Sequence, residues 1–290
     1  EKCLSSFEWE NLLEWYEKNG RHTLPWRQYK LPASERIYRV WLSEILLQQT
    51  QASRVVGFFE RMIERFPHIE NLAEADYDTF FRYYQGLGYY SRARNILKTA
   101  NIISNVYGGI FPSDKHALIQ LPGVGEYTSQ AILAFGYGKL YLAWDTNLEK
   151  VFARYYHGSR HNTLSNEEKA IIETDFHQFI KNSPQSSEIT VRNINNALMD
   201  FSSLVDLKEK NRIDWKSYPL RKSRFFLEQG ENEIETKKII HTFPTPDANV
   251  EVILHRDHQE YYSENPETYT SFLLPPALHR DTRKYVQDTF

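Results

Sequence analysis

Cysteine is almost absent from this chain, because Cys3 is the only one among 290 residues. A single thiol excludes an intramolecular disulfide and any metal site built from several cysteines. Such cysteine poverty is typical of proteins from reducing intracellular compartments. Long apolar runs are also lacking: none approaches the ~18 residues of a membrane span, and no signal-peptide order opens the sequence. We therefore expect an intracellular protein with no membrane partner.

An excess of basic charge is missing as well, since 35 Lys and Arg face 38 Asp and Glu, for a formal net charge of −3. This total argues mildly against a nucleic-acid partner, but the distribution of charge matters more. Residues 208–224 hold about seven basic and two acidic side chains, whereas residues 225–290 hold about six and twelve. The basic stretch is either a solvated face or a surface for phosphates.

Strand signals are scarce over the first ~200 residues, where helical periodicity recurs between prolines. Lys237–Arg256 alternates and is rich in β-branched residues, which predicts strands. We predict a mainly α fold, with a helical body of about 225 residues, a charged connector and a small C-terminal appendage with some β structure. The expected helices are Phe7–Lys18, Val40–Phe59, Asp78–Tyr84, Ala93–Tyr107, a short one through Gln120 with Ser113 as N-cap, Asn166–Asn182 and Val191–Val205.

A glycine-rich turn, LPGVGEYTSQAI, separates a helix that reaches Gln120 from one that begins near Glu126. Gly123 and Gly125 permit a tight turn and a close approach to a partner. Unpaired N–H groups at the start of the second helix would suit a DNA phosphate. A plain helix connection, in which the glycines serve only the turn, is the alternative.

Asp145 follows Gly125 by twenty residues, in LAWDTNLEKVFAR. It could simply cap a helix over Leu148–Tyr155. The joint spacing of hairpin and aspartate, however, resembles the helix-hairpin-helix, Gly-Val-Gly…Asp signature of a superfamily of base-excision glycosylases. That combination is far more specific than either half.

Glu44 is expected on a helix among mostly apolar neighbours. At helical spacing these are Val40, Trp41, Leu47 and Gln48. Burial without a partner would raise the pKa of the Glu44 carboxyl, and unpaired buried glutamates are rare in cores, which favours a functional role. A buried ion pair with an arginine, such as Arg39 or Arg54, is the alternative.

Six segments in order resemble the adenine DNA glycosylase (MutY) family, over roughly residues 7–206. The related endonuclease III type lacks a glutamate at the position of Glu44 and has a lysine, which makes it a lyase, where this chain has Tyr127. The resemblance therefore implies a monofunctional glycosylase. The six segments are LPWR (Leu24–Arg27), VWLSEILLQQTQ (Val40–Gln51), GLGYYSRARN (Gly86–Asn95), GGIFP (Gly108–Pro112), LPGVGEYT (Leu121–Thr128) and NNALMDF (Asn195–Phe201).

The resemblance implies a helix-hairpin-helix glycosylase fold, with the active site in a cleft between two helical subdomains. One would comprise residues 1–30 and 137–225, and the other, with six helices and the hairpin, residues 31–136. Residues 226–290 would be a connector and a short C-terminal region, a truncated or replaced 8-oxoguanine-recognition domain. The expected partner is double-stranded DNA with adenine opposite 8-oxoguanine or guanine. We expect a monomer, cytoplasmic at the nucleoid if bacterial and nuclear if eukaryotic.

The resemblance also implies roles for single residues. The adenine would be flipped out, and Glu44 would protonate its N7 and later activate water. Asp145 would stabilise the oxocarbenium ion or bond briefly to C1′, as in retaining glycosidases. Asn147 would orient Asp145, and Tyr127 would hydrogen-bond within the pocket.

Contacts to DNA follow from the same resemblance. Gln49 and Tyr89 match residues that wedge into the base stack, a role that suits flat, polar-tipped side chains. The base pocket would be lined by Trp26, Arg27 and Leu47, although core packing is an open alternative for Trp26 and Leu47. Further DNA contacts are expected at Gln48, Thr50, Arg92, Gly123, Val124 and Gly125.

The chain departs from the family in three places. Thr146 replaces the usual glycine after Asp145, which puts the pocket geometry in doubt. The family's C-x6-C-x2-C-x5-C pattern for a [4Fe–4S] cluster is lost, so the sequence predicts a clusterless member without a cofactor. Only about fifty-five residues follow Glu235, fewer than the family's Nudix-like domain has. Near the four cysteine positions stand Asp206, Ile213, Lys216 and Lys222.

Three functions stay open on the sequence. The leading hypothesis is an adenine glycosylase whose basic 208–224 loop keeps a DNA-backbone contact. A second enzyme of the same fold would remove thymine from G·T mismatches, since such relatives share a tyrosine at the position of Tyr127. The third is a lesion-binding protein with weak catalysis, against which the presence of both Glu44 and Asp145 argues.

Overall fold

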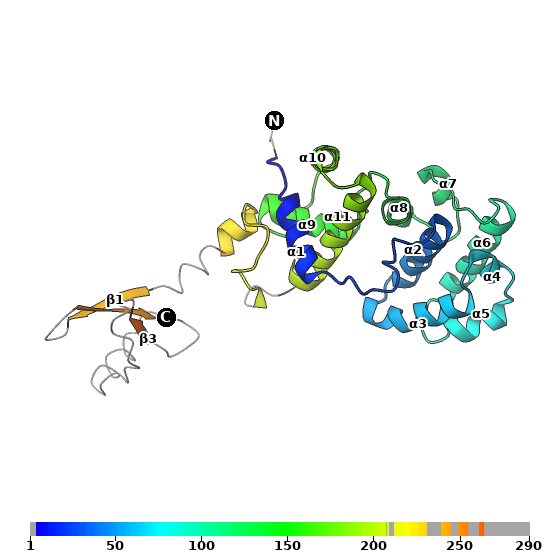
Figure 1. The fold of residues 1–290 in the computed structure, drawn as a ribbon, viewed down its shortest axis with the longest axis horizontal. Coiled ribbons are helices and arrows are strands. Elements are labelled where there is room, and N and C mark those ends of the chain that lie inside the picture. The colour runs from blue at the N-terminus through cyan, green and yellow to red at the C-terminus, as the bar shows by residue number, and fades with distance from the viewer. Residues whose placement is uncertain are drawn as a thin grey trace. The chain divides into compact units, whose positions relative to one another are not determined.

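The computed structural model describes residues 4–206, 208 and 212–230, and the backbone of three short strands that follow. The chain divides into two compact units, residues 1–228 and 229–290. The first unit is helical throughout its described part, which confirms the mainly α prediction (Figure 1). Its elements are α1 Trp9–Asn19, α2 Ala33–Leu47, α3 Ala52–Arg65, α4 Ile69–Ala73, α5 Tyr77–Tyr84, α6 Tyr90–Asn105, α7 Lys115–Ile119, α8 Glu126–Ala131, α9 Thr146–His157, α10 Asn166–Asn182 and α11 Ser187–Phe201, with π-helical turns η1 Ile132–Tyr137, η2 Ser202–Asp206 and η4 Phe226–Gly230.

The second unit contains an antiparallel sheet. Strand β1, Ile239–Pro244, pairs with β2, Asn249–Leu254, so that Ile239 lies opposite Leu254. Strand β2 then pairs with β3, Tyr261–Ser263. The strands predicted within Lys237–Arg256 are therefore confirmed at the level of the backbone. The expected replacement of an 8-oxoguanine-recognition domain lies outside the described residues.

Helix positions agree with the sequence pattern where caps are strong, and α10 spans the predicted Asn166–Asn182. Its N-cap Ser165 accepts from the backbone N–H of Glu168, whose side chain accepts from the N–H of Ser165, a capping box. Two expectations were wrong at the caps. The short helix before the hairpin is capped by Asp114 rather than Ser113, because the Asp114 carboxylate accepts from Ala117 N at 3.0 Å. The last helix begins at Ser187 and ends as a π-turn at Asp206.

The single helix predicted over Val40–Phe59 is also wrong, because the chain breaks it into α2 and α3. Helix α2 ends at Leu47, and Gln49 takes a left-handed backbone with φ of 56°. Helix α3 restarts at Ala52. The apolar spacing runs on across the break, so periodicity alone could not reveal it.

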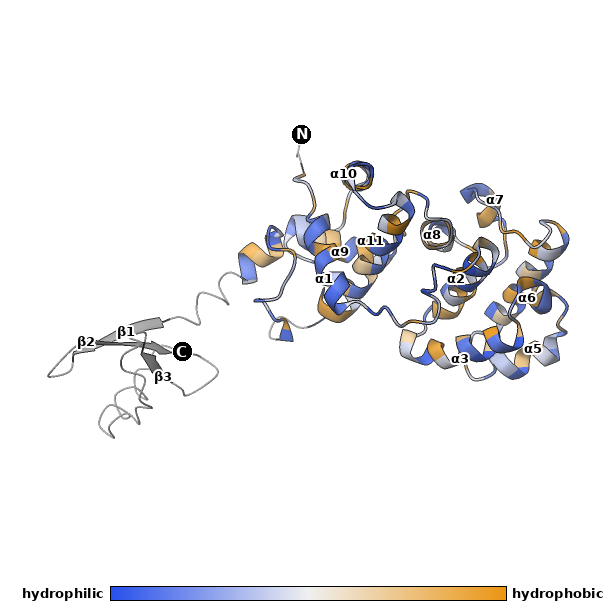
Figure 2. Ribbon diagram, viewed as in Figure 1, coloured by the Kyte–Doolittle hydropathy of each residue, from blue (hydrophilic) through white to orange (hydrophobic). Residues whose placement is uncertain are grey.

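Helices α2 to α7 surround one hydrophobic core, and α1, α9, α10 and α11 form a second group, with α8 between them (Figure 1). The first core holds fully buried aromatic rings such as Trp41, Phe59 and Phe80. The second is built from ring contacts, for example between Trp9 and both Phe152 and Phe176. The helices of both groups mix hydrophobic and hydrophilic residues along their length, as amphipathic helices do (Figure 2).

The π-turn η1 joins the two groups, since it packs against both α2 and α11. Its last carbonyls are bound by arginines from either side. Arg36 Nε donates to Gly136 O at 2.8 Å, and Arg192 Nε donates to Phe135 O at 2.9 Å. Helix α8, which runs directly into η1, is therefore held rigidly between the two cores.

Residues 212–226 pack onto the second group through aromatic side chains. The ring of Tyr218 stacks on Phe226 and contacts Phe201 edge-on. Beneath them, Arg154 Nη1 donates to the Asp206 carboxylate at 2.7 Å, and Asp206 is only 1% exposed. The Arg154 guanidinium also lies 4.1 Å from the centre of the Phe225 ring. This ion pair and the ring cluster fix the segment to the helical body.

Removing one partner of that ion pair should be costly. Asp206→Ala leaves the Arg154 charge buried without its carboxylate, so we expect the free energy of unfolding to fall by about 3–5 kcal/mol. The exposed Asp214, whose partners among the described residues are Lys216 and Ser217 of its own turn, provides the matched control, and Asp214→Ala should cost under about 1 kcal/mol. Urea unfolding of both variants measures the difference. Equal losses in the two variants would contradict the stapling role of Asp206.

Candidate active site

Glu44 lies in the last turns of α2, with only 8% of its surface exposed. Tyr127, in the first turn of α8, donates its hydroxyl to Glu44 Oε2 at 2.8 Å. The two residues are 83 positions apart in the sequence. The carboxyl is thus desolvated and oriented by one neutral donor from the helix that follows the hairpin.

The environment raises the pKa of Glu44 to about 7, and burial is the largest cause. The hydrogen bond from Tyr127 and the positive charge of Arg27 lower that pKa, whereas the carboxylate of Asp145 raises it. Near neutral pH the carboxyl therefore exists in both forms. Such a group can give a proton and later take one back.

The alternative ion pair between Glu44 and an arginine is wrong for both residues considered. In the part of the chain that the structure describes, Arg39 donates to Gln28 Oε1 and Arg54 donates to the carbonyl of Gly86. Tyr127 takes the place of an arginine beside the carboxyl.

Asp145 is the N-cap of α9, so the capping alternative is confirmed. Its Oδ1 accepts from the backbone N–H groups of Asn147 at 2.9 Å and Leu148 at 2.7 Å. Its Oδ2 accepts from the Asn147 side-chain amide at 3.0 Å. Partial burial raises the pKa of Asp145, and these hydrogen bonds oppose that rise. Capping fixes the carboxylate without using the remaining acceptor capacity of Oδ2.

The strand-like segment before Asp145 is held from both cores. Gln130, one turn after Tyr127 on α8, accepts from the N–H of Trp144 at 3.1 Å. Asn195 on α11 accepts from the N–H of Ala143 at 2.8 Å. Neither residue was singled out from sequence, although the spacing of Gln130 from Tyr127 places both on one face of the helix. Asp145 is therefore positioned by the same helix that binds Glu44.

The two hairpin glycines differ in what requires them. Gly123 has φ of +80°, and a Cβ there would lie 3.2 Å from Asn95 Cβ, so the turn itself demands glycine. A Cβ on Gly125 would meet no atom within 4 Å. The turn-only alternative therefore explains Gly123 and leaves Gly125 unexplained. The side chain of Val124 is buried in the first core, which leaves its backbone for any contact to DNA.

Gln49 and Tyr89 share a backbone conformation that is unusual for their type. Among the described residues, they are the two non-glycine residues with positive φ, at 56° and 53°. Both line a hollow of about 140 Å³, together with Gly123. Gln48 bridges to the hairpin, donating from Nε2 to Gly123 O at 3.2 Å, and Thr50 Oγ1 donates to Gln48 O at 3.3 Å. Residues expected to contact DNA thus gather around one hollow.

Arg92, another residue expected to contact DNA, also lines this hollow. It is only 5% exposed, and its guanidinium binds backbone carbonyls below the hollow. Because these carbonyls occupy the guanidinium, a direct contact from Arg92 to DNA stays a prediction.

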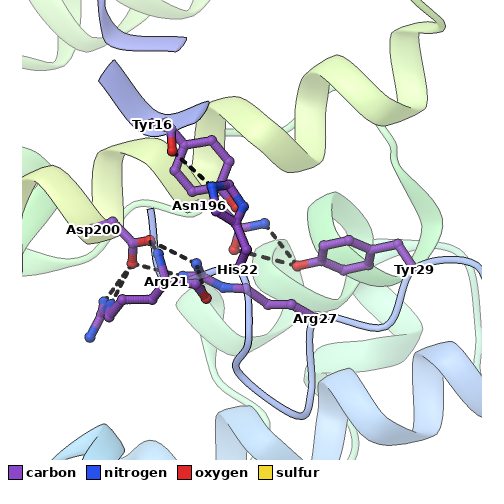
Figure 3. A network of polar contacts seen from close by, with 7 residues as sticks. All are labelled: Tyr16, Arg21, His22, Arg27, Tyr29, Asn196 and Asp200. Atoms are coloured by element: carbon purple, nitrogen blue, oxygen red, sulfur yellow. Dashed lines mark hydrogen bonds and ion pairs between the residues drawn. The ribbon is translucent and has the colours of Figure 1, made fainter. Parts of the chain in front are cut away.

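The three residues expected in the base pocket are packed or paired. Trp26 is buried edge-on against Phe59, and Leu47 packs against the same core. Arg27 Nη1 and Nη2 donate to the fully buried Asp200 carboxylate at 2.8 and 2.9 Å. Figure 3 shows how Arg21 binds the same carboxylate, while Asn196, also on α11, donates to the Tyr29 hydroxyl at 3.0 Å. A role for these three in holding the base stays a prediction.

The residues near the four cysteine positions of the family do not fit an iron–sulfur cluster. Asp206 is paired with Arg154, and Ile213 has no ligand atom. Lys216 is exposed, and a lysine offers no thiolate. Across the described residues, no three His, Cys, Asp or Glu side chains gather as a metal site would require. Nor is any helix of that part long and apolar enough to cross a bilayer.

Comparison with known proteins agrees with this geometry. Residues 42–174, which include Glu44, Tyr127 and Asp145, match the HhH-GPD superfamily of base excision DNA repair proteins. A solved structure of a thermostable thymine-DNA glycosylase is similar over 76% of this chain and 95% of its own, with a TM-score of 0.61 and 25% identity. This part of the chain is thus similar to that superfamily, and the sequence relatives of the chain are named adenine DNA glycosylase.

Those relatives span bacteria and mammals. The adenine DNA glycosylase of Buchnera aphidicola subsp. Baizongia pistaciae is 43% identical over 148 residues, which are 51% of this chain and 41% of the relative. The mouse adenine DNA glycosylase is 36% identical over 148 residues, which are 50% of this chain and 28% of the relative. The chain thus spans less than half the length of these relatives.

The hydrogen bond from Tyr127 should set the pH range of proton donation by Glu44. Because this bond lowers the pKa of Glu44, Tyr127→Phe should raise that pKa above about 7. Any rate that needs protonated Glu44 is lost as pH rises through this pKa, so its basic limb should move to higher pH in the variant. Single-turnover rates between pH 6 and 9 measure the midpoint. A midpoint that stays in place or moves to lower pH would rule out this role.

Proposed function

We propose that the chain is a monofunctional DNA glycosylase that removes adenine mispaired with 8-oxoguanine or guanine. The reaction is hydrolysis of the N-glycosidic bond after the base has left the duplex. The observation that carries the proposal is the electrostatic coupling of Glu44, Tyr127 and the capped Asp145 around α8. We expect it to act as a monomer on double-stranded DNA, in the compartment that holds the chromosome.

Glu44 supplies the acid. In its protonated form it gives its proton to adenine N7, so that the C1′–N9 bond breaks and adenine leaves as a neutral base. The hydrogen bond from Tyr127 orients the carboxyl during this transfer. Because Tyr127 has no amine, it cannot form the Schiff base that a lyase reaction needs.

Asp145 stabilises the charge that develops on the sugar. Its carboxylate is fixed by three hydrogen bonds, and Oδ2 can face the oxocarbenium ion or bond briefly to C1′. Water then adds its oxygen to C1′ and gives a proton to the Glu44 carboxylate. This step restores the protonated acid and leaves an abasic site.

The choice of adenine rests on the sequence relatives. Proteins named adenine DNA glycosylase are 35–43% identical, above the 25% of the thymine-DNA glycosylase structure, so the thymine alternative is not favoured. Recognition of 8-oxoguanine stays a prediction, because the region expected to provide it lies outside the described residues.

We further propose that the chain works without an iron–sulfur cluster, its place being taken by the Arg154–Asp206 pair and the packed rings. Phosphate contact by the 208–224 loop is likewise a prediction.

Single-turnover cleavage of end-labelled duplexes tests the proposal. We expect alkali-dependent breaks at adenine in A·8-oxoG and A·G duplexes and none at thymine in T·G. Glu44→Gln removes the acid and should slow base release by at least 100-fold while DNA binding persists. The exposed Glu74→Gln is the matched control and should react as the wild type does. Abasic sites from none of the duplexes, or full activity in Glu44→Gln, would overturn the proposal.

A further inference from the structure

Arg92 is a buried cation whose hydrogen-bond partners among the described residues are all uncharged. From α6, its Nη1 donates to Gln48 O at 2.6 Å and Leu46 O at 3.0 Å, and its Nε donates to the Tyr84 hydroxyl at 2.8 Å. Within the described part of the chain, no carboxylate pairs with it. Burying a guanidinium without a counter-ion costs free energy. We therefore infer that the hydrogen bonds to its neighbours are what requires Arg92 at this position.

Tyr84 extends these contacts to a second loop. Its ring is fully buried, and its hydroxyl donates to Gly88 O at 2.6 Å and also lies 3.1 Å from Tyr89 O. The Arg92–Tyr84 pair therefore binds the carbonyl just before Gln49 and the carbonyls at Tyr89. The two residues with a left-handed backbone, Gln49 and Tyr89, therefore both lie next to carbonyls that the Arg92–Tyr84 pair binds.

The Arg92 guanidinium also contacts the aromatic ring of Tyr89. It lies 5.2 Å from the centre of the Tyr89 ring, within the range of a cation–π contact. That ring is 54% exposed at the hollow that Arg92 and Gln49 also line. Arg92 Nη2 is buried there without a partner among the described residues. A left-handed backbone at a non-glycine residue is strained and persists only where its surroundings hold it in place.

We propose that Arg92 is a positioning residue that, with Tyr84, locks Gln49 and Tyr89 into one preformed wedge. The wedge then enters the base stack as a unit, without first ordering two separate loops. This inference rests on the proposed function and on the expectation from sequence that Gln49 and Tyr89 part the base stack.

A double-mutant cycle tests the coupling between Arg92 and Tyr89. Arg92→Met and Tyr89→Ala should each slow single-turnover base release about 10-fold, in the range of direct couplings between neighbours. If the two residues act as one unit, the double variant should also be slowed about 10-fold rather than about 100-fold. The fluorescence of 2-aminopurine beside the mispair, which reports unstacking, should fall in parallel.

Further variants separate positioning from general damage. Tyr84→Phe keeps the buried ring and the Arg92 charge but breaks the link to Gly88 and Tyr89, so it should show the same non-additivity with Tyr89→Ala. If Arg92→Met does not fold, Tyr84→Phe in combination with Tyr89→Ala tests the coupling in its place. Arg94→Met removes the same charge from the exposed side of α6 and should leave the rate at saturating enzyme unchanged. The pH midpoint of base release, which reports Glu44, should not move in Arg92→Met.

Additive effects, with the double variant slowed about 100-fold, would overturn the inference, as would a displaced pH midpoint. These outcomes leave the proposed function standing, because they require an active wild type. A wild type that releases no base from any duplex would instead refute the proposed function.

Discussion

The hydrogen bond between Tyr127 and Glu44 is the contact around which the site is organised, because it places a desolvated carboxyl against the helix that follows the hairpin. Burial raises the pKa of that carboxyl toward neutrality, and the neutral hydroxyl orients it without neutralising it as an arginine would. An ion pair in its place would lower the pKa and keep the carboxyl ionised. The proposed proton transfer by Glu44 therefore depends on a polar but uncharged partner in a desolvated site.

Helix α8 turns this single contact into a site. One face of it carries Tyr127 toward Glu44 and Gln130 toward the segment that ends in Asp145, and its first turn follows the hairpin. The π-turn η1 extends α8 between α2 and α11, where Arg36 and Arg192 bind its final carbonyls. A displacement of α8 would therefore move Tyr127 away from Glu44, shift the segment that carries Asp145, and move the hairpin at the same time.

Much of the fold followed from local signals, since α10 has a capping box and Gly123 has the backbone that only glycine adopts easily. The motifs in the sequence also predicted Glu44 and Asp145 as site residues. What failed depended on tertiary contacts. The break after α2 has a left-handed Gln49 that no periodicity records, and the partner of Glu44 lies 83 residues away. The burial of Arg92 likewise depends on carbonyls at the end of α2 and just after it, which no local pattern around Arg92 records.

Burial thus holds the carboxyl of Glu44 near its neutral form. A ¹³C NMR titration of protein labelled at the glutamate carboxyl carbons tests it directly, with Glu44→Gln used to assign the resonance. We expect a carboxyl that titrates near pH 7 in the wild type and is missing from the variant. A Glu44 resonance that titrates near the ordinary 4.5 would contradict it.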